Sequence, residues 1–154
     1  MSVAGIDPGK DGGVAIRCHN GSWVAFPMPI VGGEVAVAQI ADELQTQDVS
    51  RVVIERQQAM PKQGVASTFT IGRNYGKLLG ALEARRIPFQ EVPAKSWKAK
   101  VLKGTKKDKD AAIAYAHRIA PGVELMPGKR TTPHDGIADA VCMADYALAQ
   151  EGSQ

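Results

Sequence analysis

Four acidic residues in this sequence of 154 residues lie where their carboxylates could act together. Asp7 ends an apolar run before a turn rich in Pro and Gly, and Glu55 ends a second, β-branched run. Asp135 and Asp139 are four residues apart at the start of the last predicted helix, so they share one of its faces. If the two apolar runs are adjacent parallel strands, Asp7 and Glu55 emerge at the same edge of the sheet.

A cluster built of carboxylates favours a hard cation. Oxygen ligands select Mg²⁺ or Mn²⁺, and two such ions can clamp the attacking and leaving oxygens of an in-line phosphodiester displacement. Ordinary structural roles are the alternative, because Asp7 could serve only the turn and Asp135 only the helix dipole. Asp139 lies among small apolar residues, so we expect it to be partly buried and to need a partner.

His134 directly precedes these helical acids and has three possible roles. It could ligate a metal, orient a water as a base, or simply stand at the start of the helix. Successive helical residues are rotated by about 100°, so His134 and Asp135 can both point inward only if His134 precedes the helix proper.

Basic residues are concentrated in one stretch. Between Lys95 and Lys109 there are seven lysines and one acid, a local charge of +6, although the net charge of the whole chain is only +3. A solvated surface is the simpler interpretation, but Trp97 is interleaved and Gly104 breaks the run. A localised basic patch beside a hard-metal site favours a phosphate backbone as substrate. The predicted DNA-binding residues are Lys98, Lys100, Lys103, Lys106, Lys107, Lys109, Lys129 and Arg130.

The spacing of apolar residues predicts the elements that must position these groups. An antiparallel meander opens the chain, with an Asn-Gly hairpin turn, and helices alternate with strands afterwards. The predicted strands are 2–7, 13–18, 22–28, 51–55 and 87–92. The predicted helices are 34–47, 65–86, 94–103, 108–120 and 134–150, with a loop at 121–133. This order predicts an α/β fold with a mixed five-stranded sheet flanked by helices.

Composition is that of a globular protein, with 44% hydrophobic and 23% charged residues. The length favours one domain over residues 1–154. No apolar run approaches the roughly 18 residues of a membrane helix, and no signal pattern precedes the first predicted strand. Cys18 and Cys142 lack metal-ligand spacing and are interpreted as buried, reduced thiols of a cytoplasmic protein.

Several motifs together resemble those of RuvC-type Holliday junction resolvases. They are Gly5-Ile-Asp-Pro-Gly9, Val53-Ile-Glu55, the basic stretch from Trp97 to Lys109, and Asp135 with Asp139-Ala140. The resemblance implies an RNase H-like nuclease domain in which Asp7, Glu55, Asp135 and Asp139 bind metal. It also implies that Lys98 and Lys109 match the family's important lysines. The last two acids are four apart here, where many members have a spacing of three or a His, so His134 stays open as the fourth ligand.

The implied reaction is paired nicking of a four-way DNA junction by a homodimer. The implied cofactor is Mg²⁺, two ions in number and replaceable by Mn²⁺. The implied location is the cytoplasm, in association with the nucleoid, for a protein encoded by a bacterium or a phage. We expect the dimer to use the face of Gly72, Gly76 and Gly80. The family's junction-wedging aromatic has no counterpart directly after Glu55, and Phe69 and Tyr75 come later.

Two other functions stay open. An ATP-binding domain of the actin and sugar-kinase type shares the RNase H-like core, but this chain is short for two such domains. A junction-binding protein without catalysis would use the acids structurally, and it would bind DNA with or without metal.

Overall fold

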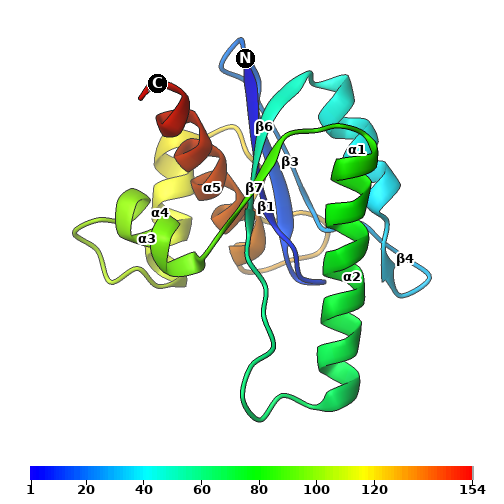
Figure 1. Ribbon diagram of the computed structural model, residues 1–154. Helices are drawn as coiled ribbons and strands as arrows, with labels where there is room; N and C mark the ends of the chain where they lie inside the picture. Colours follow the sequence, from blue (N-terminus) through cyan, green and yellow to red (C-terminus); the bar gives the residue numbers. More distant parts are fainter. Residues whose placement is uncertain (154) are drawn as a thin grey trace.

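The computed structural model describes residues 1–153, and in this range a five-stranded sheet lies between two layers of helices (Figure 1). The strand order is β3-β2-β1-β6-β7. Strands β1 (Ser2–Asp7), β2 (Gly13–Arg17) and β3 (Trp23–Pro27) form the antiparallel meander. Strands β6 (Val49–Glu55) and β7 (Phe89–Val92) run parallel to β1. The predicted mixed sheet is therefore confirmed.

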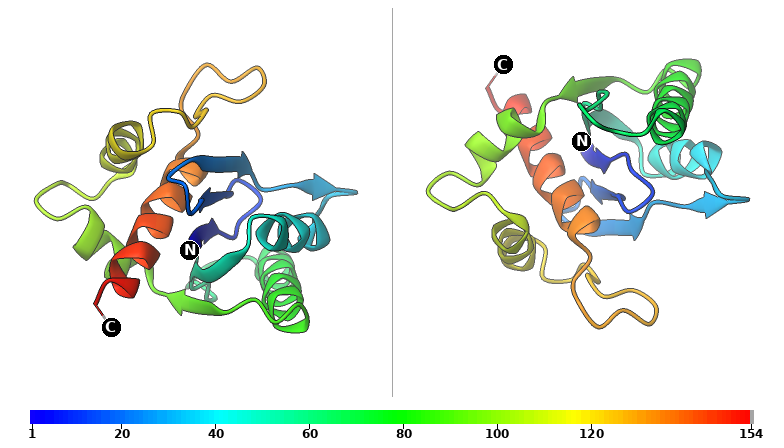
Figure 2. Two further views of the ribbon diagram at one scale, coloured as in Figure 1. Left: turned by 90° about the horizontal axis from the view of Figure 1, so that it is seen from above. Right: turned by 90° about the horizontal axis from the view of Figure 1, so that it is seen from below.

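The helices divide between the two faces of the sheet (Figure 2). Helices α1 (Val37–Thr46) and α2 (Val65–Ala84) cover one face, where Ala4 and Ile6 of β1 are buried. Helices α3 (Ala94–Val101), α4 (Lys109–Ile119) and α5 (Asp135–Glu151) cover the other, where Val3 is buried. Alternate residues of one strand face opposite sides, so the nearly continuous apolar sequence of β1 follows from burial on both faces.

Helix α5 packs with its backbone against the start of the chain. A Cβ atom built on Gly5 would lie 2.1 Å from the carbonyl oxygen of Ala140, and one on Gly136 would lie 2.3 Å from that of Asp11. Gly136 also forms an isolated parallel bridge with Gly12. Only residues without a side chain allow this approach, which brings the first turn of α5 beside the end of β1.

The predicted boundary that differs most from the structure is the start of the first helix. The helix predicted over 34–47 begins at Val37, because β5 (Glu34–Val35) pairs with β4 (Ile30–Val31) as a small hairpin. Gly32 and Gly33 form its turn with φ values of +59° and +76°, a conformation that favours glycine. The apolar spacing that continues into the helix concealed this hairpin.

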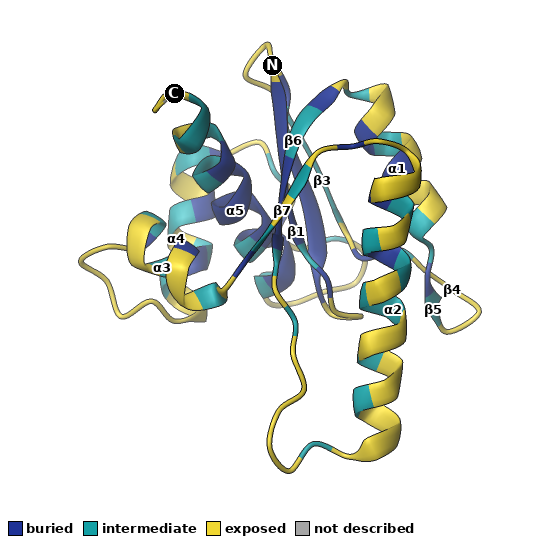
Figure 3. Ribbon diagram, viewed as in Figure 1, coloured by how far each residue is buried: buried dark blue, intermediate teal, exposed yellow. Residues whose placement is uncertain are grey.

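Helix α2 extends well beyond the sheet, beside the loop at 56–64 (Figure 1). Along α2, all of which the structure describes, only Leu78 and Leu82 are buried, and both lie in its second half. The first half is largely exposed (Figure 3), including Val65 and Phe69, which are 90% and 71% exposed. Among residues 1–153, no helix has the length and apolar character to cross a membrane.

Candidate active site

The four predicted acids come from three elements that meet at one edge of the sheet. Asp7 ends β1 and Glu55 ends β6, and the two strands are parallel neighbours with Ile6 opposite Ile54. Burial first, and then repulsion from the carboxylates of Glu55, Asp139 and Asp135, together raise the pKa of Asp7 to about 8. The chain thus places negative charge close together in a site where water is scarce, which is unfavourable without a cation.

Asp139 lies one turn into α5 and is half-buried, as its apolar neighbours predicted. Its pKa is raised to about 6, mainly by burial; the Lys98 ammonium opposes this rise, and the Glu55 carboxylate contributes to it. Lys98 also lowers the pKa of Asp7. One lysine therefore faces two of the acids and partly compensates their charge.

Asp135 is the first residue of α5 and pairs with Lys109, the first residue of α4. The Nζ atom of Lys109 lies 2.8 Å from Oδ2 of Asp135. The hydrogen bond from Lys109 holds the pKa of Asp135 below its usual range. The pKa values of the two acids are therefore shifted in opposite directions, so Asp135 stays ionised when Asp7 is protonated.

His134 precedes the helix and is its N-cap. Its Nδ1 atom accepts a hydrogen bond from the backbone N–H of Ile137 at 3.2 Å, and the residue is 7% exposed. Burial lowers the pKa of the imidazole, and the nearby Arg130 lowers it further. The neutral ring therefore caps the helix through Nδ1, which leaves Nε2 for any other partner.

Trp97 of α3 was expected only as an aromatic among lysines, but it is completely buried. Its Nε1–H donates a hydrogen bond to Oε2 of Glu55 at 3.0 Å. The ammonium of Lys98 lies 5.3 Å from the centre of the Trp97 ring. Sequence reasoning missed this role because the pairing joins residues 42 positions apart.

The remaining predicted DNA-binding residues lie farther from the acids. Lys103, Lys106 and Lys107 are exposed in the segment between α3 and α4. Lys100 contacts the Tyr146 ring, with its Nζ 5.6 Å from the ring centre. Lys129 and Arg130 are exposed in the 121–133 loop. These residues therefore lie on α3, on the segment between α3 and α4, and on the 121–133 loop, whereas Lys98 and Lys109 are the lysines that act on the acids.

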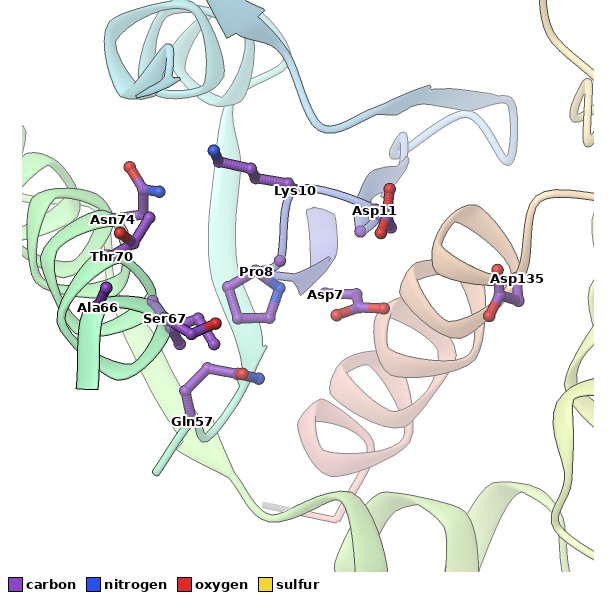
Figure 4. Close-up of a pocket in the computed structure, with 13 residues that line it drawn as sticks. Asp7, Pro8, Lys10, Asp11, Gln57, Ala66, Ser67, Thr70, Asn74 and Asp135 are labelled. Carbon is purple, nitrogen blue, oxygen red and sulfur yellow. The ribbon is translucent and has the colours of Figure 1, made fainter. Parts of the chain in front are cut away.

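A groove of about 640 Å³ opens on the other side of the acids (Figure 4). Asp7 and Asp135 line it together with the Pro8 to Gly12 turn, and α2 forms its far wall. Sequence reasoning missed Lys10 and Asp11 of this turn, although both lie in the Gly-rich segment that follows Asp7. The Asp11 carboxylate is a minor contributor to the pKa values of both Lys109 and His134: Asp135 is the main cause of the raised pKa of Lys109, and burial is the main cause of the lowered pKa of His134.

The donors fit a hard divalent cation in their chemistry. All four acids offer oxygen ligands, and the pKa of Asp7 is raised by burial and, second, by the neighbouring carboxylates. In the part of the chain that the structure describes, no three His, Cys, Asp and Glu side chains are arranged to hold a metal ion as they stand.

A mixed sheet of this order, with helices on both faces and acids at the ends of its central parallel strands, defines the RNase H-like fold of the RuvC type. Three solved structures share it. Thermus thermophilus RuvC in complex with a Holliday junction substrate has a TM-score of 0.69 at 18% identity, over 99% of this chain and 97% of that chain. A second T. thermophilus RuvC structure has a TM-score of 0.64 at 21% identity, with the same coverage.

The yeast mitochondrial Holliday junction resolvase Ydc2 has a TM-score of 0.58 at 16% identity, over 92% of this chain and 75% of that chain. No family model matches this sequence, and no curated protein matches it either. At these identities the likeness establishes the fold, and it confirms in structure the predicted resemblance to RuvC-type resolvases.

Proposed function

We propose that this chain is a structure-selective endonuclease that resolves four-way DNA junctions by paired, metal-dependent phosphodiester hydrolysis. The supporting observation is the meeting of Asp7, Glu55, Asp135 and Asp139 at one sheet edge, with Lys98 and Lys109 beside them. The solved structures of the same fold, one of them bound to a Holliday junction, are described as RuvC or as a resolvase. Residues 1–154 act in this proposal as a single nuclease domain.

The four acids are the proposed metal ligands, with His134 as a possible further one through Nε2. When bound, two Mg²⁺ ions supply an activated water and stabilise the leaving oxygen of the displacement. The chain's own contribution is to hold the four carboxylates in place. Glu55 is held by Trp97 and Asp135 by Lys109, while Asp7 and Asp139 are fixed by the packing of β1 against α5.

The lysines divide into two proposed roles. Lys98 and Lys109 lie against the acids, so their ammonium groups are placed to contact the scissile phosphate. Lys100, Lys103, Lys106, Lys107, Lys129 and Arg130 lie farther out and would hold flanking phosphates through charge, with a strong dependence on salt.

The proposed assembly is a homodimer, because two opposed cuts in a nearly two-fold symmetric junction require two sites. The proposed interface is the face of α2 bearing Gly72, Gly76 and Gly80. Apart from the neighbouring backbone of α2 itself, no heavy atom among residues 1–153 lies within 4 Å of a Cβ built on any of the three, so a second backbone can approach. Phe69, in the exposed first half of the helix, adds apolar surface.

The second candidate is a junction-binding protein that does not cut. One observation favours it: among residues 1–153, no three His, Cys, Asp or Glu side chains are arranged to hold a metal ion. Incubating the purified protein with a synthetic four-way junction, with Mg²⁺ or with EDTA, separates the two. Paired nicks that need Mg²⁺ and disappear in Asp139→Asn support the nuclease. Metal-independent binding without nicks at any Mg²⁺ or Mn²⁺ concentration supports the binding protein.

A further inference from the structure

We propose that Tyr115 of α4 and Asp145 of α5 are positioning residues, which fix the rotation of α4 against α5 and thereby hold Lys109 beside Asp135. The inference rests on the proposed function, in which Lys109 contacts the scissile phosphate. The hydroxyl of Tyr115 donates a hydrogen bond to Oδ2 of Asp145 at 2.6 Å, which joins the two helices. Tyr115 lies six residues after Lys109, a distance of about 9 Å along the helix axis.

The chain on either side of α4 is irregular. The segment at 102–108 belongs to no helix or strand and contains two residues with positive φ, Gly104 at +80° and Lys107 at +56°. The 121–133 loop follows the other end of the helix. Such connecting segments move more than the elements they join. The placement of α4 therefore depends on α5, beside which it lies on the side away from the sheet (Figure 2).

The fully buried part of α4 specifies its rotation weakly. It consists of two small residues, Ala112 and Ala116, which form one stripe with Lys109 at a spacing of three and four residues. Burial of methyl groups is favourable but has no preferred direction. The Sγ atom of Cys142 on α5 donates to the carbonyl oxygen of Ala112 at 3.8 Å, and a thiol is a weak donor.

The bond from Tyr115 to Asp145 lies beside this stripe and supplies a direction. Tyr115 is rotated by about 100° from Ala116 around the helix, so rolling of α4 about its axis would break the bond. Both partners are half-buried. Burial, followed by the hydrogen bond to Asp145, raises the pKa of Tyr115 and keeps its hydroxyl protonated as a donor.

Packing around the Tyr115 ring is open on the side away from α5. The guanidinium of Arg118 lies 4.8 Å from the centre of the ring. Beyond it, a groove of about 490 Å³ separates α4 from the 102–108 segment, with Tyr115 and Arg118 among its lining residues. The restraint on α4 at this point therefore comes from the hydrogen bond to Asp145.

The ion pair at the start of α4 depends on this placement. Nζ of Lys109 lies 2.8 Å from Oδ2 of Asp135, but the Lys109 side chain is 79% exposed. An exposed ion pair contributes little to stability, so it follows the position of the helix and does not fix it. Misplacement of a reacting group by about 1 Å can cost about a hundredfold in rate. Rolling of α4 would therefore reduce cleavage through Lys109.

The experiment compares single-turnover cleavage of a synthetic four-way junction in Mg²⁺ with junction binding in EDTA. Tyr115→Phe and Asp145→Ala remove the bond, and each should slow cleavage about tenfold while junction affinity stays within about twofold of wild type. Asp145→Asn keeps an acceptor oxygen and should restore the wild-type rate. Tyr146→Phe is the matched control, because it removes a hydroxyl one position along α5 and leaves the ring that Lys100 contacts.

A double variant separates the placement of Lys109 from a general loss of stability. If Tyr115 acts through Lys109, Tyr115→Phe combined with Lys109→Ala should cleave no more slowly than Lys109→Ala alone. A further loss of about tenfold in the double variant would overturn the proposal. A wild-type cleavage rate for Tyr115→Phe would overturn it as well.

The carboxyl carbon NMR signal of Asp135 in the metal-free protein provides a readout that does not need cleavage. Lys109→Ala removes the ion pair and should shift this signal. Tyr115→Phe and Asp145→Ala should shift it in the same direction, whereas Asp145→Asn should not. If the protein cuts no junction but the signal moves as expected, the positioning role is supported and the nuclease proposal fails. An unchanged signal in Tyr115→Phe would overturn the positioning role whatever the cleavage result.

Discussion

The indole Nε1 of Trp97 donates a hydrogen bond to Oε2 of Glu55 at 3.0 Å, from a side chain with no exposed surface. The bond fixes one oxygen of the carboxylate that ends β6 and leaves Oε1 available for another partner. A buried indole N–H needs an acceptor, so each group satisfies the other. The bond defines Trp97 as a positioning residue for Glu55.

Trp97→Phe should keep the ring packing and lose only this hydrogen bond. We expect cleavage to fall about ten- to a hundredfold, with half-maximal activity at a higher Mg²⁺ concentration, as for other groups that orient a metal ligand. A Mg²⁺ titration followed by thermal unfolding measures the affinity without catalysis. Trp23→Phe on β3 is the matched control. Equal Mg²⁺ affinity in both variants would show that Trp97 serves packing alone.

Asp7→Asn should abolish cleavage and yet stabilise the metal-free protein. The pKa of Asp7 is raised from 3.8 to about 8, so its stabilising protonated form is lost as pH rises through that range. Asparagine resembles the protonated form at every pH. The gain should therefore be small near pH 4 and largest above pH 8, on the order of 5 °C in Tm.

Thermal unfolding in EDTA at several pH values checks this expectation. Glu83→Gln, an exposed acid of α2, should show no such pH-dependent gain. Adding Mg²⁺ should raise the Tm of the wild type more than that of Asp7→Asn. A lower Tm for Asp7→Asn at pH 8.5 would contradict the burial of an uncompensated charge at this site.

The lysines beside the acids and those farther out should have different effects on cleavage rate and on DNA affinity. Lys98→Ala and Lys109→Ala should lower the cleavage rate more than the affinity, because both ammonium groups lie beside the acids. Lys103→Ala and Lys106→Ala should weaken binding and reduce the slope of log affinity against log salt by about 0.9 each. Single-turnover rates and binding titrations at several salt concentrations measure both. The same effect from all four would mean that the lysines form only an electrostatic surface.

Substitutions of Asp135 and of His134 should differ in how much cleavage activity they remove. Asp135→Asn should lose nearly all activity at every Mg²⁺ concentration, whereas His134→Ala should lose about ten- to a hundredfold and about 1 kcal/mol of stability from the lost cap. His134→Asn restores a capping side chain, so it should recover the stability. If it also recovers the activity, His134 acts only as the cap. Greater loss from His134→Ala than from Asp135→Asn would make the histidine the fourth ligand.

Gly76→Arg tests the dimer. The monomer has open space at this position, so the variant should fold normally and shift light scattering at micromolar concentration from dimer to monomer. Gly122→Arg adds the same side chain at another open glycine and should stay dimeric. A wild type that is monomeric and still makes paired cuts would rule out the proposed interface.

Local pattern determined most of the fold. The strands, the long helix and the final helix follow from apolar spacing and from turn residues such as Asn20 and Gly21, because these signals act over a few residues. The hairpin at 30–35 escaped because its two strands have two residues each. Burial of Asp139 was predictable, since its neighbours in the sequence are small and apolar.

Only the tertiary structure decided how the acids are held. Trp97 and Glu55 are 42 positions apart, and Lys109 and Asp135 come from different helices, so no local spacing joins them. The close approach of α5 depends on Gly5 and Gly136 meeting backbone from distant segments. The groove likewise exists because α2 and the turn after β1 face each other across the site. Sequence patterns report which residues share a face, but long-range packing determines which faces meet.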